Sequence, residues 1–358
     1  MVSIHSGRWF RFFILMMAAA LLLAGCGSQV QETKPIEPKG KVYFTYFDTV
    51  SYIYDYSGDS AERFDDRSAE TSLLLEEYHR LFDIYHEYAG INNLCTLNKK
   101  AGGEALPVDE KLIDFLLYAK EMENLTHGEM NVMLGAVLRL WHECREEASE
   151  SPSKARIPTE EALYAASAHT SIDLLEIDPE KKTVRISDPE ASIDVGALGK
   201  GYATEMAARM LEEKGALGYV LNIGGNIRII GSRPDGTGWK TGIRNPSDPD
   251  GAFAMQIYIS DTACVSSGVY ERFFVAEGKR WHHIIDPDTL YPAATFSALT
   301  VITKDSGLAD ALSTALFCMD YEQSRSLVDS LDGVEVCWFF PDGEQRMTEG
   351  FSKLIVKE

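Results

Sequence analysis

The segment Ser192-Ile-Asp-Val-Gly-Ala-Leu-Gly-Lys-Gly-Tyr-Ala203 contains the clearest structural pattern in the chain. An aspartate between apolar residues is followed by a glycine turn, and the spacing then predicts a helix over about Leu198–Lys214. Free backbone N–H groups at such a helix start favour an anion, and Lys200 adds a positive charge. The segment matches neither GxxxxGK[ST] nor GxGxxG. The pattern alone therefore leaves open an anion site or an ordinary strand–turn–helix.

Strands and helices alternate irregularly on both sides of this segment. We expect one long or bent strand over Val42–Tyr56 and helices over Ser60–Tyr85, Asp109–Leu125, Leu134–Glu147 and Thr159–Ala168, then a hairpin over 172–186. Beyond residue 190 we expect strands within Gly218–Ile230, Gly238–Ile243, Ala254–Ile259, Ala263–Val265 and Phe296–Thr303, and a helix over Gly307–Cys318. Without a strict βαβ alternation, the prediction is α+β: a single domain with a mixed sheet and packed helices.

Composition limits the classes of function. The chain has 358 residues, of which 45% are hydrophobic, so it can build a substantial core. Its formal net charge of −21 counts against binding nucleic acid, because phosphate would repel such a surface. Six cysteines without a CxxC pair are too few for a disulfide scaffold and do not support a zinc ribbon. We expect most of them to be small buried apolar residues.

The first residues predict a targeting segment rather than part of the fold. Arg8 and Arg11 precede an apolar run over Phe12–Leu23, and Leu23-Ala-Gly-Cys26 resembles the lipobox of bacterial lipoproteins. An uncleaved membrane anchor is the alternative, but the run is shorter than the roughly 20 residues that a spanning helix needs. We therefore predict a signal peptide at 1–25, a lipid-modified Cys26 with a tether to residue 41, and one catalytic domain at 42–358, anchored on the extracytoplasmic face of the cell membrane.

Four further motifs suggest chemistry, each with a plainer alternative. Leu221–Ile227 has two glycines inside a strand pattern, which indicate a close approach of backbone to ligand or a hairpin turn. Ser266–Phe273 can line a site or form an exposed turn. His283 and Asp286, in His282-His-Ile-Ile-Asp-Pro287, lie at a strand end, and histidine is the usual proton shuttle at neutral pH.

The fourth motif is Leu308-Ala-Asp-Ala-Leu-Ser-Thr-Ala-Leu316. Asp310 and Thr314 are four residues apart and thus share one face of the predicted helix. Both offer hard oxygen ligands suited to Mg²⁺. Alternatively, the helix dipole favours an aspartate in the first turn, and the threonine is simply packed.

Together these motifs resemble the ApbE-type FAD:protein FMN transferases. The residues that carry the resemblance are Phe47-Asp-Thr49, Asp194–Ala203, Asn222-Ile-Gly-Gly225, Ser267-Gly268 with Tyr270-Glu-Arg272, His283–Pro287 and Ala309–Thr314. They occur in the family's order over residues 44–318. The resemblance implies binding of FAD, use of Mg²⁺, and transfer of FMN to a threonine hydroxyl of a partner protein with release of AMP.

The resemblance also assigns roles to individual residues. It places the metal at the Ala197 carbonyl, the Asp310 carboxylate and the Thr314 hydroxyl. The FAD contacts that it implies are Phe47, Tyr85, Glu129, Met130, Asn131, Asp194, Lys200 and Ile285. His283 is our candidate for the base that takes the hydroxyl proton, and Asp286 either orients it or fixes the turn.

Three departures from the family pattern affect this assignment. The chain has Glu129-Met-Asn-Val-Met133 for Ala-Phe-Asp-Pro-Thr, Leu290 for the glycine of Thr-Gly-x-Pro, and Asn226 where aspartate often follows the paired glycines. The acceptor motif that the resemblance implies, Asp-[Ser/Thr]-Gly-[Ala/Ser]-[Ser/Thr], is absent from this chain, so we expect a separate extracytoplasmic acceptor. The alternatives are an FAD pyrophosphatase and a non-catalytic flavin-binding lipoprotein. Asp310, Thr314 and His283 favour an enzyme.

Overall fold

A computed structural model describes residues 37–233 and 235–357. The predicted signal peptide, Cys26 and most of the predicted tether lie outside the described residues. Within the described ranges, no helix is both long enough and apolar enough to cross a membrane.

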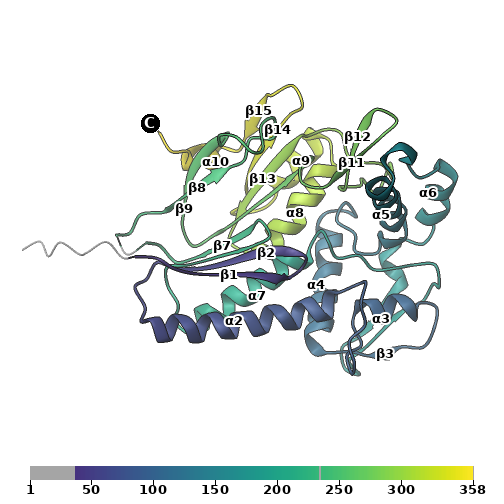
Figure 1. The fold of residues 1–358 in the computed structure, drawn as a ribbon, viewed down its shortest axis with the longest axis horizontal. Helices are drawn as coiled ribbons and strands as arrows, with labels where there is room; N and C mark the ends of the chain where they lie inside the picture. The colour runs from purple at the N-terminus through teal and green to yellow at the C-terminus, as the bar shows by residue number, and fades with distance from the viewer. Residues whose placement is uncertain (1–36, 234, 358) are drawn as a thin grey trace, which may run out of the picture. The chain divides into compact units, whose positions relative to one another are not determined.

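An eight-stranded sheet forms the centre of the domain, and every neighbouring pair of its strands is antiparallel (Figure 1). In spatial order the strands are β1 (Lys39–Tyr46), β2 (Thr49–Asp55), β6 (Tyr219–Ile223), β7 (Asn226–Ile230), β10 (Ala263–Gly268), β13 (Ala298–Thr303), β14 (Glu335–Phe339) and β15 (Gln345–Met347). Because antiparallel strands place alternate side chains on opposite faces, the sheet carries two separate cores.

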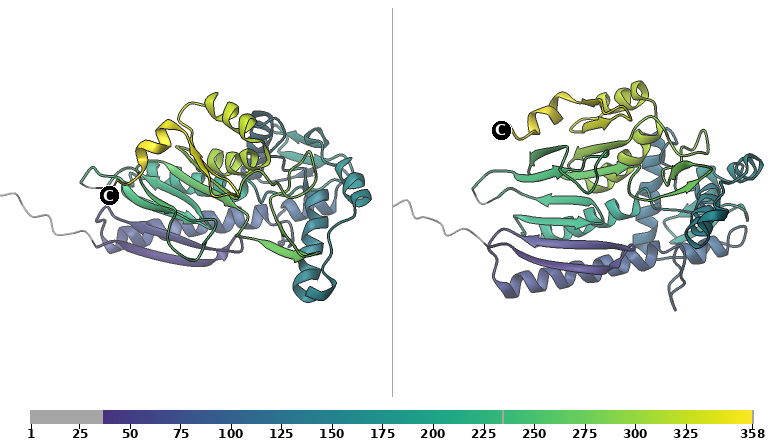
Figure 2. Two further views of the ribbon diagram at one scale, coloured as in Figure 1. Left: turned by 90° about the horizontal axis from the view of Figure 1, so that it is seen from above. Right: turned by 45° about the horizontal axis from the view of Figure 1, so that its top comes forward.

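Helices cover one face of this sheet (Figures 1 and 2). These are α2 (Ala61–Phe82), which packs on β1, α7 (Gly199–Glu213), which packs on β6 and β7, and α8 (Ser306–Cys318), which packs on β10 and β13. The helix α4 (Glu110–Leu125) packs against α2. The buried side of α8 is rich in alanine and leucine, so the helix can approach both the sheet and α7 closely.

The opposite face of the sheet has a smaller core. The hairpin of β8 (Trp239–Ile243) and β9 (Met255–Ile259) covers it together with α10 (Glu349–Leu354). The helix α9 (Tyr321–Asp329) packs beside α8 and is tied to the sheet by a hydrogen bond from Trp338 Nε1 to Ser324 Oγ (2.8 Å).

A third apolar cluster lies around Trp141 and Trp281. It joins α5 (Gly135–Glu150) and α6 (Glu160–Ser167) to the separate hairpin of β11 (Phe273–Ala276) and β12 (Lys279–His282). The remaining elements are α3 (Leu94–Lys99) and a small sheet of β3 (Leu106–Pro107), β5 (Thr183–Ile186) and β4 (Leu175–Asp178).

The α+β prediction is confirmed; the main sheet is antiparallel throughout rather than mixed, and the prediction of one long or bent strand at its start is wrong. Val42–Tyr56 is not a single strand but the β1–β2 hairpin, whose turn residues Phe47 and Asp48 have φ of 52° and 50°. Two consecutive positive φ values make a tight turn that suits the strand twist. The turn contains no glycine, so the sequence did not predict it. The strand also begins at Lys39, inside the predicted tether, because the Lys39 ammonium pairs with Asp55 (3.0 Å).

The exposed-turn alternative for residues 266–273 is wrong for its first part, because residues 266–268 end strand β10. Ser266 Oγ pairs with Thr300 Oγ1 on the neighbouring strand β13 (2.8 Å), as a strand residue does with its cross-strand neighbour. The expectation for the cysteines is confirmed: the five in the described part of the chain are all free and buried, namely Cys95, Cys144, Cys264, Cys318 and Cys337.

Candidate active site

The site is organised by a close crossing of α7 and α8 at Gly201. A Cβ atom on this residue would lie 2.3 Å from Asp310 Cβ and 2.4 Å from the Ser306 carbonyl oxygen, so only glycine allows this approach. The Gly201 N–H, in the first turn of α7, donates to Asp310 Oδ2 (2.8 Å). The crossing thereby brings the Asp310 carboxylate to the positive end of the α7 dipole.

Asp310 is a buried carboxylate with little positive charge around it. Its residue is 5% exposed, and the Lys200 ammonium lies 3.9 Å from Oδ2. Burial raises the pKa of Asp310 above its usual value, although Lys200, the Gly201 N–H and Asn226 act in the opposite direction. A carboxylate in such surroundings is stabilised by a further cation.

The other two predicted metal ligands lie beside this crossing. Thr314 is one turn beyond Asp310 on α8, and Ala197 is in the turn that leads into α7; both are partly buried. Ser313 fixes this part of α8, since its hydroxyl donates to the Asp310 carbonyl (2.9 Å) and pairs with Ser267 Oγ on β10 (2.9 Å). The predicted metal residues thus come from two segments more than a hundred residues apart that the Gly201–Asp310 bond joins.

His283 lies in the loop after β12 with its ring held by backbone. Its N–H donates to the Arg272 carbonyl (3.1 Å), and Nδ1 lies 3.2 Å from the same oxygen. Because a carbonyl can only accept, Nδ1 carries the proton and Nε2 keeps its lone pair. Burial, with a smaller contribution from Arg272, lowers the pKa of His283 to about 3, so the ring is neutral at pH 7.

The neighbours of His283 shape the loop. His282 Nε2 donates to the Ala293 carbonyl (2.8 Å), and its Nδ1 accepts from the Ile284 N–H (3.3 Å), so both nitrogens are used in the structure. Asp286 Oδ1 accepts from the N–H groups of Asp288 (2.8 Å) and Thr289 (3.2 Å). Of the two roles open to Asp286, these bonds favour fixing the turn.

Leu290 stands where the resemblance expects a glycine, and its backbone is left-handed. Its φ is 65°, in the left-handed region that glycine adopts at little cost. Trp141 Nε1 donates to its carbonyl (3.0 Å), and its side chain packs on the cluster around Trp141. Tertiary contacts therefore offset the backbone strain at this position.

Two predicted flavin contacts are aromatic residues near the start of α7. Phe47, in the β1–β2 turn, packs edge-on against His79 with ring centroids 5.8 Å apart. Tyr85 follows α2 and is 56% exposed, and its phenol is close enough to Asp194 for that carboxylate to raise its pKa, after the larger effect of burial. Asp194 Oδ1 in turn accepts from the Gly196 N–H (2.9 Å). The Tyr85 phenol and the Asp194 carboxylate thus lie close to each other.

In residues 129–131, two side chains are held in the fold and one has an atom without a hydrogen-bond partner. Met130 is fully buried in the main core, and Asn131 bonds to the Thr170 carbonyl (2.9 Å) and to the Met133 N–H (2.8 Å). The Glu129 Oε2 atom is buried without a hydrogen-bond partner within the described ranges. Burial, followed by the charges of Asp288 and Asp286, raises the pKa of Glu129 to about 7. Of the three side chains, only that of Glu129 is free to meet a ligand. Ile285 is itself 4% exposed.

Sequence reasoning missed several residues near this site. Asn226 is buried beside Asp310 and was noted only as a departure from the family. The charges of Arg145, Arg272 and Asp194 all act on the imidazole of His142, which places these groups close together although their sequence positions give no sign of it.

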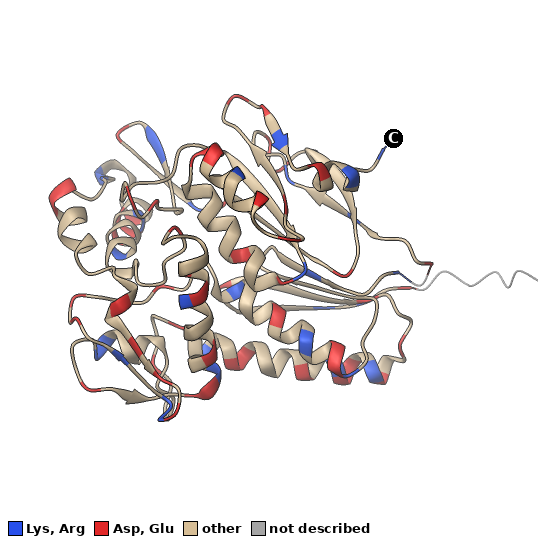
Figure 3. Cartoon of the chain, turned by 180° about the vertical axis from the view of Figure 1, so that it is seen from behind, with Lys and Arg blue, Asp and Glu red and all other residues tan. Residues whose placement is uncertain are grey.

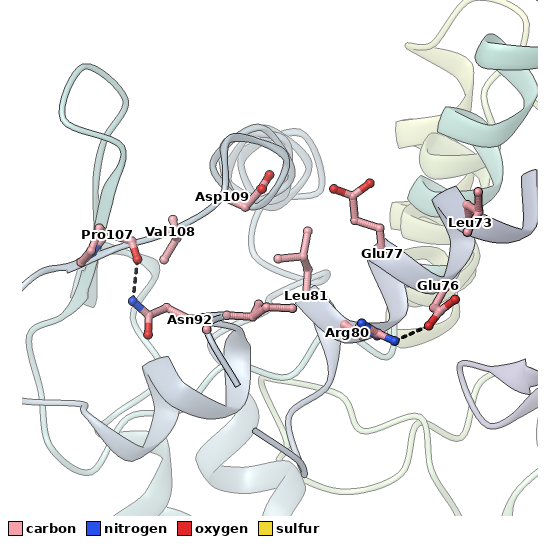
Figure 4. Close-up of a pocket in the computed structure, with 11 residues that line it drawn as sticks. Leu73, Glu76, Glu77, Arg80, Leu81, Asn92, Pro107, Val108 and Asp109 are labelled. Carbon is pink, nitrogen blue, oxygen red and sulfur yellow. Dashed lines mark hydrogen bonds and ion pairs between the residues drawn. The ribbon is translucent and has the colours of Figure 1, made fainter. Parts of the chain in front are cut away.

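A hollow of about 660 Å³ lies away from the residues described so far (Figure 4). Its walls come from the end of α2 and from the segments 90–92 and 107–109, where Asn92 Nδ2 donates to the Pro107 carbonyl (2.8 Å). None of its lining residues is a predicted site residue, so volume does not identify the site in this protein.

Most of the chain matches a known protein family. The family model described as ApbE family matches residues 49–338. This chain belongs to the ApbE family. It is 30% identical over 301 residues to the FAD:protein FMN transferase of Treponema pallidum (strain Nichols), covering 79% of this chain and 81% of the relative. It is 29% identical over 322 residues to the enzyme of the same name from Vibrio cholerae serotype O1, covering 89% and 91%.

Solved ApbE structures have the same fold. The ApbE protein of Thermotoga maritima superposes with a TM-score of 0.77 at 27% identity, covering 90% of this chain and all of the other. The flavin transferase ApbE of Vibrio cholerae superposes with a TM-score of 0.73 at 26% identity, covering 89% and 100%.

Proposed function

We propose that this ApbE-family chain is an FAD:protein FMN transferase that uses Mg²⁺, attaches FMN to a threonine hydroxyl of an acceptor protein, and releases AMP. The observation that carries the proposal is the buried Asp310 carboxylate at the start of α7, with the Lys200 ammonium 3.9 Å away. The names of the relatives support the same activity.

The donor set at the α7–α8 crossing fits Mg²⁺. A carboxylate (Asp310), a hydroxyl (Thr314) and a backbone carbonyl (Ala197) are all hard oxygen ligands. Within the described ranges no three His, Cys, Asp or Glu side chains gather as a metal site, so binding here would depend on the hydroxyl, the carbonyl and substrate oxygens. When bound, Mg²⁺ would neutralise charge on the pyrophosphate of FAD. Lys200 is placed to add to this effect.

The proposed transfer is a displacement at phosphorus. The threonine oxygen attacks the phosphorus of the FMN half, the bond from that phosphorus to the bridging oxygen breaks, and AMP leaves with that oxygen. His283 Nε2 takes the hydroxyl proton, while its Nδ1–H stays on the Arg272 carbonyl. An anionic pyrophosphate beside the ring raises the pKa of His283 from its low value and so makes it a better base.

We further propose that the protein works on the extracytoplasmic face of the cell membrane, held by lipid on Cys26. The sequence pattern of residues 8–26 supports this. The acceptor would be another extracytoplasmic flavoprotein with a segment of the type Asp-[Ser/Thr]-Gly-[Ala/Ser]-[Ser/Thr].

One experiment separates the proposal from its alternatives. The protein is mixed with FAD and Mg²⁺, with and without a carrier protein bearing Asp-Ser-Gly-Ala-Thr, and AMP and protein-bound flavin fluorescence are measured. AMP that forms only with the carrier, together with a fluorescent carrier band, is the expected result. AMP without the carrier would indicate an FAD pyrophosphatase, and no AMP in either mixture would indicate a flavin-binding protein without catalysis.

The catalytic assignment has its own test. His283→Ala should retain FAD binding, measured by quenching of flavin fluorescence, and lose transfer. Unchanged transfer by this variant would show that His283 is not the base.

A further inference from the structure

On the edge strand β1, the apolar side chains point away from the helices. Tyr43 lies on the side of α2, where its hydroxyl donates to the Ser68 carbonyl (3.2 Å). Because successive side chains of a strand alternate between its two faces, the neighbours Val42 and Phe44 lie on the opposite face of the sheet. They are 46% and 74% exposed. The apolar residues of a strand ordinarily face a core, so this reversal points to a surface that meets something outside the domain.

Tyrosines on β2 extend the same surface. The strand register places Tyr52 opposite Val42 and Tyr54 opposite Gly40, so both rings lie on the face of Val42. The two rings stack with centroids 6.0 Å apart, and a Cβ atom on Gly40 would lie 2.8 Å from the Tyr54 ring. Both tyrosines are partly buried by this packing. We call this surface the open sheet face; it consists of Val42, Phe44, Tyr52 and Tyr54.

The layers of the domain that are described end beside the open sheet face. The β8–β9 hairpin covers the sheet as far as Tyr56, which packs against Trp239 with ring centroids 6.0 Å apart. The helix α2 packs on the other face of the sheet and carries acidic and basic residues along its length (Figure 3). The open sheet face itself is made of uncharged side chains, although 25% of the residues in the chain are charged. An uncharged aromatic surface suits a lipid interface better than an ionic partner.

The start of the chain favours a lipid surface as the occupant. The proposed lipid-modified Cys26 lies about a dozen residues before β1, which begins at Lys39, and a chain of that length spans at most about 45 Å. An anchor at this distance makes contact with the membrane intramolecular, so even a weak affinity for lipid is sufficient. Tyrosine rings are moreover enriched at the level of lipid headgroups, because one end of the ring is apolar and the other polar.

We infer that the open sheet face lies on the surface of the membrane that holds the Cys26 lipid, with its tyrosine rings among the headgroups. This inference rests on the lipid anchor of the proposed function and adds to it which side of the domain faces the membrane. The turn at the end of β1 carries Phe47, a predicted flavin contact, so the rim of the candidate site would lie close to lipid. Acceptor threonines held near the membrane surface would then be favoured.

Single cysteines test this orientation. The five cysteines in the described part of the chain are all buried, so a new exposed cysteine can be labelled selectively. The full chain is isolated from membranes as Phe44→Cys and as Leu73→Cys, labelled with the fluorophore NBD, and reconstituted in vesicles of phosphatidylethanolamine and phosphatidylglycerol. Leu73 is the matched control, because it is 67% exposed but lies on α2. Lipid with a nitroxide on its headgroup then quenches any label at the interface.

The label at residue 44 should lose more than about half of its fluorescence to the nitroxide lipid, because interfacial side chains lie about 5–10 Å into the headgroup boundary. The label at residue 73 should lose less than about a tenth. A second pair, Val42→Cys and Leu117→Cys, repeats the comparison at positions that are 46% and 40% exposed, so the result does not depend on the folding of one variant. Equal quenching within both pairs would overturn the inference.

Other occupants of the face would give other results, and each of these would also overturn the inference. A dimer in detergent that dissociates in Phe44→Ser would assign the face to a second copy of the chain. A raised KM for the carrier protein in detergent with Phe44→Ser, without quenching at residue 44, would assign it to the acceptor. A chain without lipid on Cys26, as measured by mass spectrometry, would refute the anchor and the inference together. Selective quenching at residue 44 without any flavin transfer would support the inference and refute the transferase proposal instead.

Discussion

Two buried carboxylates, Asp310 and Glu205, join α7 to α8, and their surroundings differ. Glu205 is 4% exposed, and Arg228 Nε (3.1 Å), Arg209 Nε (3.1 Å) and the Ser306 N–H (2.9 Å) all donate to it. Asp310, equally buried, receives the Gly201 N–H, and among the described residues only Lys200, 3.9 Å away, forms an ion pair with it. A buried carboxylate with its full set of donors holds structure, whereas one whose nearby cation lies beyond hydrogen-bond distance keeps oxygen lone pairs for a metal ion.

The arginine that pairs with Glu205 is also fully compensated in charge. Arg228 is 1% exposed and pairs with Glu212 (2.8 Å) and Asp261 (3.7 Å) as well as Glu205, so three carboxylates balance its charge. Removing one partner of such a network leaves a buried charge uncompensated. We therefore expect substitutions around Glu205 to affect folding, and substitutions around Asp310 to affect activity.

The largest effect is expected for Asp310→Asn. Transfer should fall by at least about 10²-fold, because the main carboxylate of the proposed metal site is lost. Stability without Mg²⁺ should be unchanged or higher, since burial of this charge is unfavourable. Activity assays and thermal unfolding measure the two effects. Normal transfer by a folded variant would remove Asp310 from the metal site.

The reverse outcome is expected for Glu205→Gln. The free energy of unfolding should fall by about 1.5–3 kcal/mol, because the hydrogen bonds from Arg228 and Arg209 lose their charged acceptor while Arg228 keeps Glu212. The variant should transfer FMN normally per folded molecule at low temperature. Denaturant titration and assays at matched folded fraction check this. Were Glu205→Gln stable but inactive, the distinction between the two carboxylates would be wrong.

Gly201→Ala tests the close approach on which the Asp310 site depends. The added methyl should cost about 1–3 kcal/mol of stability, because it meets the Ser306 carbonyl and Asp310 Cβ. It should also weaken Mg²⁺ binding by displacing the carboxylate, which isothermal titration with Mg²⁺ and an FAD analogue would measure. Full stability with unchanged Mg²⁺ affinity would contradict this helix crossing.

The smallest effect concerns pH. His283 has a folded pKa of about 3, so below its unfolded pKa of about 6.5 the unfolded state binds more protons and stability falls as the pH falls. The loss should be at most about 2 kcal/mol at pH 5, given one proton and 1.36 kcal/mol per pH unit.

Asp310 acts in the opposite direction. Its folded pKa is raised, so the stability it contributes is lost as the pH rises through the window between its unfolded and folded values. His283→Gln should therefore reduce the loss of stability between about pH 6.5 and 5. Asp310→Asn should make the stability depend less on pH above about pH 4. Unfolding curves for both variants across this range would test the assignment, and identical curves would contradict it.

Much of the fold and part of the site could be predicted from the sequence. Asp109, Thr159 and Ser60 cap helices at the predicted starts, because capping and apolar spacing are local properties. The β1–β2 turn was missed, because Phe47 and Asp48 adopt positive φ without a glycine or asparagine. The environment of Glu129 was also missed, since it depends on Asp286 and Asp288, which are distant in sequence.

The sequence by itself determined the α+β class, the motif order and the residue types of the site. Periodicity, turns and the presence of oxygen ligands depend only on residues that are close together in the chain. The tertiary structure decided which carboxylate has its full set of donors and which has a cation only beyond hydrogen-bond distance. That depends on where Arg228 and Lys200 come to lie relative to Glu205 and Asp310. Burial, charge compensation and the meeting of Gly201 with α8 arise only when segments distant in sequence pack together.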